Sequence, residues 1–262
     1  MEGLNLEKLS NKNNWQFALE IFLKEWKEKD FVEAALLTGS HATGMETVHS
    51  DVDVYIILSE DVRWRERGNK VIDGVLIEYF ANPPRQIKHY FEKEHEEGSR
   101  CTARIVAIGK VLFDKTGITE ELKKEALEYM RKPFERPDGV WVEIAKYGLW
   151  DHLDSVKDAK ERNDPSFSHL YHIAINETLR IYSKFLCVEG PPASKAYRLF
   201  TEEGFRKAYL FEPFPDERFV ELFLKAMRNE EVEALEELIS HVFEKMGGFD
   251  IDGWRLRTKT EV

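Results

Sequence analysis

The chain has 262 residues, 42% of them hydrophobic and 12% aromatic, a composition typical of a globular protein with one large domain or two of ordinary size. The net charge of −11 argues against a general nucleic-acid binder, because phosphate contacts need clustered Lys and Arg. Two isolated cysteines, Cys101 and Cys187, are too few for a disulfide framework or a zinc site. No apolar run is long enough to span a membrane, and the N-terminal segment MEGLNLEKLSNKNNW is too polar for a secretory signal, so we expect a cytoplasmic protein.

The first part of the chain predicts helices and strands in mixed order. We predict, in chain order, a helix ending near Lys29, a strand at about Ala34–Thr38, a strand opening at Asp51, a hairpin turn at Asp73-Gly74 leading into a strand over Val75–Phe80, a helix from Pro83-Pro84 to about Glu97, and strands over Thr102–Ile108 and Val111–Phe113. This domain would end near Thr116-Gly117.

Two carboxylates, Asp51 and Asp53, open the second of these strands. Alternate side chains of a strand share a face, so both acids point the same way while Val52 and Val54 point into the core. Carboxylates this close repel each other unless a cation lies between them. Glu78 lies between apolar neighbours on a later strand, and we expect it to join the two aspartates. Three such acids suit Mg²⁺, which prefers oxygen ligands and substrate phosphates.

The turn after the first strand supplies groups that carboxylates lack. At Gly39 the backbone can approach a ligand closely because no Cβ is in the way. The hydroxyl of Ser40 and the N–H groups that follow can donate to phosphate oxygens. We therefore predict that Thr38, Gly39 and Ser40 bind a nucleotide beside the metal.

This region resembles the nucleotidyltransferase superfamily, whose signature is a strand, Gly-Ser, a short helix, Asp-x-Asp on the next strand and a third acid further on. The matching residues are Gly39-Ser40-His41-Ala42-Thr43-Gly44 and Ser50-Asp51-Val52-Asp53-Val54, with Glu78 as the third acid. The amino-acid sequence of this motif is similar to that of small bacterial members, which include the aminoglycoside (kanamycin) nucleotidyltransferases. Many relatives carry Arg where Thr43 stands.

The resemblance implies an α+β catalytic domain in which Asp51, Asp53 and Glu78 bind metal, with two Mg²⁺ ions expected. It implies transfer of a nucleoside monophosphate, AMP from ATP in our reading, to a hydroxyl of a small-molecule acceptor such as an aminoglycoside, with release of pyrophosphate. The acidic net charge, taken separately, disfavours RNA or another nucleic acid as the acceptor.

From Ile118 onward the strand signals end and amphipathic helices follow. We predict helices over about 119–131, 139–161, 167–188, 195–209, 216–227 and 229–246, separated by proline-rich breaks. The fold class is therefore α+β: a mixed β-sheet domain with helices over residues 1–117, then an all-α helical bundle over 118–262 that would bind the acceptor. The aromatic content of the bundle fits either its core or a homodimer surface.

Two residues of the bundle gain a role from the resemblance. Glu143 lies where related helical domains carry a general base, on a face of helix 139–161 that also bears Tyr147 and three aspartates and lies opposite Val140, Ile144 and Leu153. The alternative is a solvated acidic face. Lys195 is similar to a lysine that related domains direct at the triphosphate, and the alternative is a surface lysine whose stem covers apolar groups.

Glu177 is a second candidate for the proton acceptor. It lies on a stripe of helix 167–188 with Ile173, Ala174 and Ile181, and burial there would raise the pKa of its carboxyl. The alternative is a structural ion pair with Arg180.

Three other functions stay open at this point, one of them a non-catalytic sensor that binds a nucleotide without releasing pyrophosphate. The acceptor could be a protein or an RNA 3′ end, as in nucleotidyltransferases of toxin–antitoxin systems. Arg162 followed by His169 also resembles the Arg…His element of HEPN ribonucleases, which would place a nuclease in the helical half.

Overall fold

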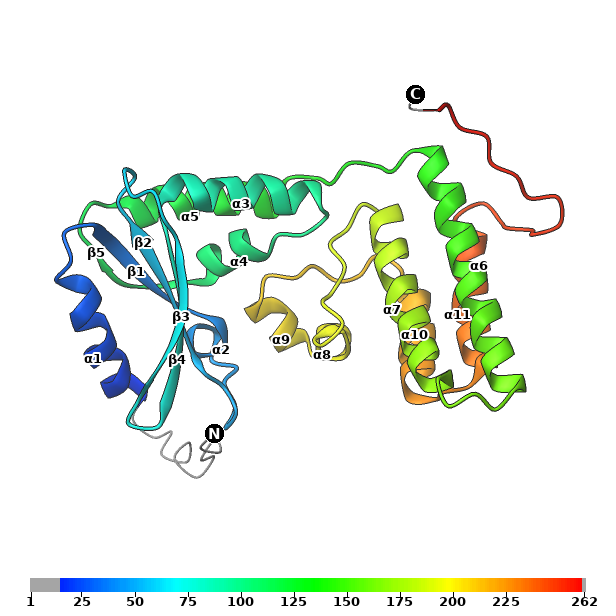
Figure 1. Cartoon of the computed structure of the whole chain (residues 1–262), viewed down its shortest axis with the longest axis horizontal. Coiled ribbons are helices and arrows are strands. Elements are labelled where there is room, and N and C mark those ends of the chain that lie inside the picture. Colours follow the sequence, from blue (N-terminus) through cyan, green and yellow to red (C-terminus); the bar gives the residue numbers. More distant parts are fainter. Residues whose placement is uncertain (1–14, 261–262) are drawn as a thin grey trace. The chain divides into compact units, whose positions relative to one another are not determined.

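The computed structural model describes residues 15–260 (Figure 1). The polar N-terminal segment that we analysed for a secretory signal lies almost entirely outside these residues. The described chain divides into two compact units: unit 1 runs to Lys132 and also takes in Lys207–Phe211, and unit 2 comprises Pro133–Arg206 and the residues from Glu212 onward. Each unit is described by itself below.

Unit 1 is built on one mixed five-stranded sheet of order β3-β4-β2-β1-β5. The strands are β1 (Val32–Thr38), β2 (Val52–Leu58), β3 (Glu66–Ile72), β4 (Val75–Asn82) and β5 (Lys110–Asp114). β2 and β4 run parallel, and the other neighbouring pairs are antiparallel. The turn at Asp73-Gly74 has positive φ at both positions, +48° and +79°, which is the geometry of a two-residue hairpin turn. The predicted hairpin is therefore confirmed.

Helices cover the two faces of this sheet. α1 (Trp15–Lys27) packs Leu19 and Phe22 onto one face, against residues such as Val54. α3 (Pro84–Glu96), α4 (Cys101–Ile108) and α5 (Ile118–Arg131) cover the other face, where Leu36, Tyr55 and Ile57 are buried. The alternation along β2 thus separates an apolar side, Val52 and Val54, from the side that carries the acids, as predicted.

Residues 101–108 form helix α4, so the strand predicted over Thr102–Ile108 is wrong. β-branched residues favoured a strand, but Ala103 and Val106, three positions apart on one side of a helix, are buried together with Leu36, Ile87 and Leu122. Packing against α5 and the sheet outweighs the local preference.

The boundary expected at Gly117 also needs correction, because α5 belongs to unit 1. Its residues Leu122 and Ala126 are fully buried in the same core as Ile87 of α3 and Val106 of α4. The division between the units falls at Lys132. The sequence shows where strands stop, but a helix following the last strand can pack on either unit.

A short returning segment completes unit 1. Arg104 of α4 is nearly buried, and its Nε donates a hydrogen bond of 2.6 Å to the carbonyl oxygen of Tyr209. Its guanidinium lies 3.7 Å from the ring centroid of Phe211, within the range of a cation–π contact. We call residues 207–211 the returning segment.

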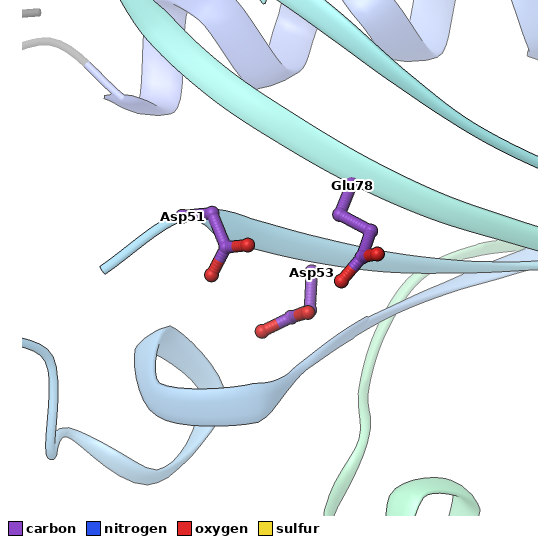
Figure 2. Close-up of side chains that lie close together, drawn as sticks. All are labelled: Asp51, Asp53 and Glu78. Atoms are coloured by element: carbon purple, nitrogen blue, oxygen red, sulfur yellow. The ribbon is translucent and has the colours of Figure 1, made fainter. Parts of the chain in front are cut away.

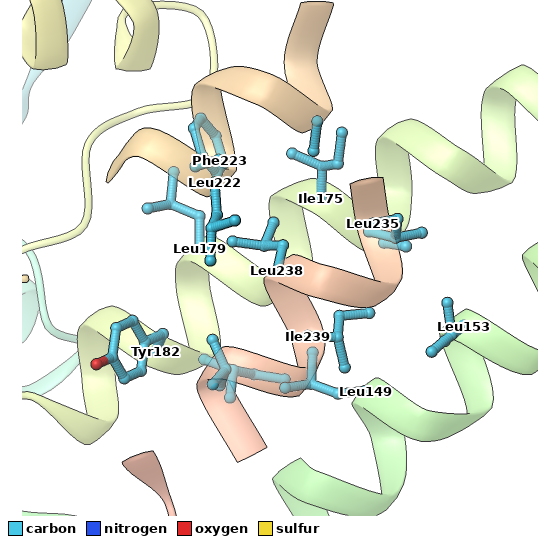
Figure 3. Close-up of a cluster of buried hydrophobic side chains, with 14 of the residues drawn as sticks. Leu149, Leu153, Ile175, Leu179, Tyr182, Leu222, Phe223, Leu235, Leu238 and Ile239 are labelled. Atoms are coloured by element: carbon cyan, nitrogen blue, oxygen red, sulfur yellow. The ribbon is translucent and has the colours of Figure 1, made fainter. Parts of the chain in front are cut away.

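Unit 2 is all-helical, as predicted for the second half. It contains α6 (Gly139–Glu161), α7 (Phe167–Phe185), α8 (Ala196–Thr201), α10 (Glu217–Arg228), α11 (Val232–Lys245) and most of α9 (Glu203–Ala208). Figure 3 shows the core between α6, α7, α10 and α11, with leucines and isoleucines such as Leu149, Ile175 and Leu238 meeting inside. The helix predicted over 195–209 is broken into α8 and α9 at Glu202, whose ψ of 99° is not helical.

Asp216 ties three helices of unit 2 together. Its Oδ1 accepts from the Phe219 backbone N–H and caps α10, and its Oδ2 lies 2.5 Å from the hydroxyl of Tyr182 (α7) and 2.8 Å from Nε2 of His241 (α11). Burial alone would raise the pKa of this carboxyl, but the hydrogen bonds lower the pKa of Asp216 to about 2. Among residues 15–260, no helix is long and apolar enough to cross a membrane.

Candidate active site

The three predicted acids meet at one end of the sheet. β2 and β4 are parallel, with Asp53 directly opposite Glu78, and Asp51 lies two residues earlier on the same face. Figure 2 shows their carboxyl groups turned toward one space, and one oxygen from each lies within 4.8 Å of the others. All three are partly exposed, so a ligand from solvent can reach them. The parallel register is what brings residues 25 apart in sequence side by side.

Three carboxylate oxygens at this separation fit a divalent cation. They are hard oxygen donors, the type that Mg²⁺ binds, and without a cation their charges repel one another. A cation held here would bind phosphate oxygens of a nucleotide, because Mg²⁺ keeps coordination positions for substrate phosphates.

The backbone of Gly39 passes directly beside Asp53. Gly39 begins the short helix α2 (Gly39–Thr43) with φ of +62°, and a Cβ at this position would lie only 1.9 Å from Oδ2 of Asp53. No side chain fits in that gap, so glycine is required by space as well as by conformation. Gly44, which ends α2 with φ of +72°, is different because no atom of residues 15–260 lies within 4 Å of the corresponding point.

The hydroxyl groups around this turn have mixed roles. Thr38 is buried, and its hydroxyl donates to the Asp53 carbonyl oxygen over 3.4 Å, so its side chain braces β1 against β2. The hydroxyl of Thr43 lies 3.2 Å and 3.1 Å from the carbonyl oxygens of Gly39 and Ser40, inside its own helix. Ser40 is partly exposed at the start of α2, where a ligand can reach it.

An arginine that we did not select from the sequence contacts the third acid. Nη2 of Arg67 (β3) lies 2.6 Å from Oε1 of Glu78, and its Nε lies 3.2 Å from the same oxygen. The guanidinium also lies 4.7 Å from the ring centroid of Phe80. This contact could have been predicted from the hairpin turn, which pairs Ile72 with Val75. Counting back along β3 from that pair places Arg67 opposite Phe80 and diagonal to Glu78.

In unit 2, Glu143 lies in an ion pair. Its Oε1 is 2.6 Å from Nζ of Lys146, which is buried and also donates to the Gly248 carbonyl oxygen over 3.0 Å. The apolar face predicted for α6 is correct only at Leu153. Val140 and Ile144 are 41% and 52% exposed.

The other candidates in unit 2 lie at the surface. Both oxygens of Glu177 contact Arg180, with a shortest separation of 2.7 Å, and its side chain is one-third exposed. Of the two alternatives for this residue, the structure therefore has the ion pair with Arg180 and not the apolar surroundings. Lys195 is exposed just before α8. Arg162 lies 2.5 Å from a carboxylate oxygen of Asp158, and His169 is exposed.

Comparison with known proteins agrees with this geometry. Residues 19–133 match the family described as "Nucleotidyltransferase domain", a segment that contains all three acids and the Gly39 turn. A solved structure of a nucleotidyltransferase-like protein from Exiguobacterium sibiricum aligns over 89% of this chain and 77% of its own, with 12% identity and a TM-score of 0.43, a likeness too weak to carry an argument. No curated protein matches the chain.

Proposed function

Because residues 19–133 form a nucleotidyltransferase domain and the chain is an enzyme of that transferase type, we propose that it moves AMP from ATP to a hydroxyl group of a small-molecule acceptor, with Mg²⁺ as cofactor. The observation that supports this most is the meeting of Asp51, Asp53 and Glu78 within 4.8 Å beside the Gly39 turn. Each part alone is common, but this combination has the donors for a metal-bound triphosphate.

The chain's own residues divide the work of the reaction. Asp51, Asp53 and Glu78 would hold one or two Mg²⁺ ions, which supply positive charge against the phosphates and the leaving pyrophosphate. The backbone N–H groups at Gly39 and Ser40 would bind phosphate oxygens, with Lys195 as a further contact. The acceptor oxygen forms a bond to the α-phosphorus, the bond from the α-phosphorus to the bridging oxygen breaks, and pyrophosphate leaves.

The proton of the acceptor hydroxyl needs a carboxylate to receive it. Our candidates are Glu78, Glu143 and Glu177. Glu143 and Glu177 each lie beside a cation of their own helix, Lys146 and Arg180, so a variant of either also breaks an ion pair. A general base is therefore identified by a changed pH profile of transfer, and a loss of stability without such a change assigns the residue to structure.

For the acceptor we propose a small cationic molecule of the aminoglycoside type. Asp151 and Asp154 are exposed on α6, beside Asp158 with its Arg162 partner, and an acidic stripe attracts cations. A protein or RNA acceptor would give a labelled macromolecule instead of a labelled small molecule, so one labelling assay distinguishes the two kinds of acceptor. Purified protein is incubated with ATP labelled at the α-phosphate, Mg²⁺ and a cell extract, and the products are sorted into small molecules, proteins and RNA.

The matched variants for this assay are Asp53→Asn and Asp61→Asn. Both remove one negative charge, but Asp61 is exposed outside the acidic cluster. We expect Asp53→Asn to lose transfer by at least about 100-fold while it unfolds cooperatively, and Asp61→Asn to retain transfer. Equal turnover by wild type and Asp53→Asn would refute the proposed function.

A further inference from the structure

The contact between Arg67 and the acidic cluster carries an inference beyond the family assignment. Two N–H groups of one guanidinium point at the same oxygen of Glu78, Oε1, at 2.6 Å and 3.2 Å. A charge-assisted pair of this kind occupies lone pairs that a metal ion would also use. Arg67 therefore occupies part of the position at Glu78 that a metal cation would need.

The surroundings of Arg67 explain why it stays there and how it could leave. Its guanidinium is held 4.7 Å from the Phe80 ring centroid, a cation–π contact that fixes the side chain along the sheet. Its side chain is nevertheless 68% exposed, against 21% for Glu78, so it can swing into solvent without losing a buried position. Exposed ion pairs of this type are weak enough for a small ligand to break.

We propose that Arg67 is a built-in counter-ion that competes with the divalent cation for Glu78, and that the phosphates of the nucleotide end this competition by binding the guanidinium. This rests on the proposed function, because it takes the three acids as the metal ligands. Arginine is well suited to the exchange because its planar fork binds carboxylate and phosphate alike. Cation and nucleotide binding are then coupled, and each strengthens the other by the same factor.

Lys70 provides a matched control on the same strand. It pairs with Glu25 of α1, with Nζ 2.5 Å from a carboxylate oxygen, so it is also a β3 cation in an ion pair. Cross-strand register places Lys70 opposite Ile77 and Arg67 opposite Phe80, on opposite faces of the sheet. Removing Lys70 therefore changes the net charge equally but leaves the acidic cluster untouched.

The experiment is calorimetric titration of MnCl₂ into wild type, Arg67→Gln, Arg67→Lys and Lys70→Gln, each with and without a non-hydrolysable ATP analogue. We expect Arg67→Gln to bind Mn²⁺ alone about fivefold more tightly than wild type, the size that an exposed ion pair allows, and to show a smaller gain from the analogue. Arg67→Lys keeps the charge and should stay near wild type, as should Lys70→Gln.

The outcomes separate this inference from the proposed function. Unchanged or weaker Mn²⁺ binding by Arg67→Gln, when wild type binds Mn²⁺ and Asp53→Asn does not, would overturn the competition and leave the transferase proposal standing. An equal gain in Arg67→Gln and Arg67→Lys would also overturn it, because the effect would come from lost packing on Phe80. Wild-type protein that binds no Mn²⁺ would overturn both proposals.

Discussion

Replacing Gly39 by alanine tests the site through a single methyl group. At φ of +62° an alanine costs about 1–2 kcal/mol relative to glycine, because its Cβ approaches the carbonyl oxygen. In addition, the new Cβ would lie 1.9 Å from Oδ2 and 2.7 Å from Cγ of Asp53. Non-bonded atoms do not approach so closely, so either the carboxylate or α2 must move by at least about 1 Å.

Gly44→Ala is the matched control because it has the same backbone strain without the clash. Its φ is +72°, and in the described part of the chain no atom lies within 4 Å of the added Cβ. We expect Gly44→Ala to lower the free energy of unfolding by about 1 kcal/mol and to keep transfer. Gly39→Ala should lose at least that stability and also about 100-fold in transfer, since a displacement of about 1 Å in a catalytic group can cost that much.

The assay combines chemical unfolding, Mn²⁺ titration and pyrophosphate release for both glycine variants. The difference between Gly39→Ala and Gly44→Ala isolates the contact with Asp53, because the conformational cost cancels. If Gly39→Ala bound Mn²⁺ and turned over like Gly44→Ala, then Asp53 would not need its present position, and the reasoning about the site would be refuted.

Three further predictions concern stability. Glu143→Gln should lower the free energy of unfolding by about 1–3 kcal/mol, because Lys146 would keep a buried ammonium with weaker partners; urea unfolding measures this, and an unchanged midpoint would contradict it. The pKa of Asp216 is about 2 in the folded protein, below its usual value of 3.8, so this carboxylate contributes about 2 kcal/mol above pH 4 that is lost as the pH falls toward 2. Between pH 5 and pH 2 the free energy of unfolding should therefore fall less steeply for Asp216→Asn than for wild type. Parallel curves for the two proteins would refute the lowered pKa of Asp216. Arg104→Leu should raise the rate of amide hydrogen exchange in residues 207–211, because the contacts of Arg104 with Tyr209 and Phe211 are lost. Exchange rates equal to those of wild type would contradict this prediction.

The Asp51–Asp53 half of the acidic site could be predicted from local strand geometry, whereas Glu78 reaches it through the parallel register of β2 and β4. Strand alternation places Asp51 and Asp53 on one face whatever the rest of the fold does, and the apolar frame of Glu78 marks a strand in the same sheet. The helices of unit 2 were also predictable, since their apolar spacing extends over many residues and prolines mark the breaks.

What the sequence could not give depends on contacts between distant residues. Half of the residues of helix α4, namely Thr102, Ile105, Val106 and Ile108, are β-branched and favour strands, and packing on α5 and the sheet decides for the helix. Helix α5 carries no mark that assigns it to unit 1. For Glu177 the sequence left two alternatives, apolar surroundings or an ion pair with Arg180, and a short apolar stripe alone does not decide between them; the structure has the ion pair.

The returning segment has a consequence for how the protein is made. Unit 1 is interrupted in sequence, because residues 133–206 must be synthesised before Lys207–Phe211 exists. At roughly 5–20 residues per second, a ribosome needs several seconds for that stretch, during which Arg104 emerges without the carbonyl and ring that receive it. A gene truncated at residue 133 would encode the sheet with its three acids but not the returning segment that Arg104 of α4 contacts. The nucleotidyltransferase domain is therefore best expressed together with unit 2.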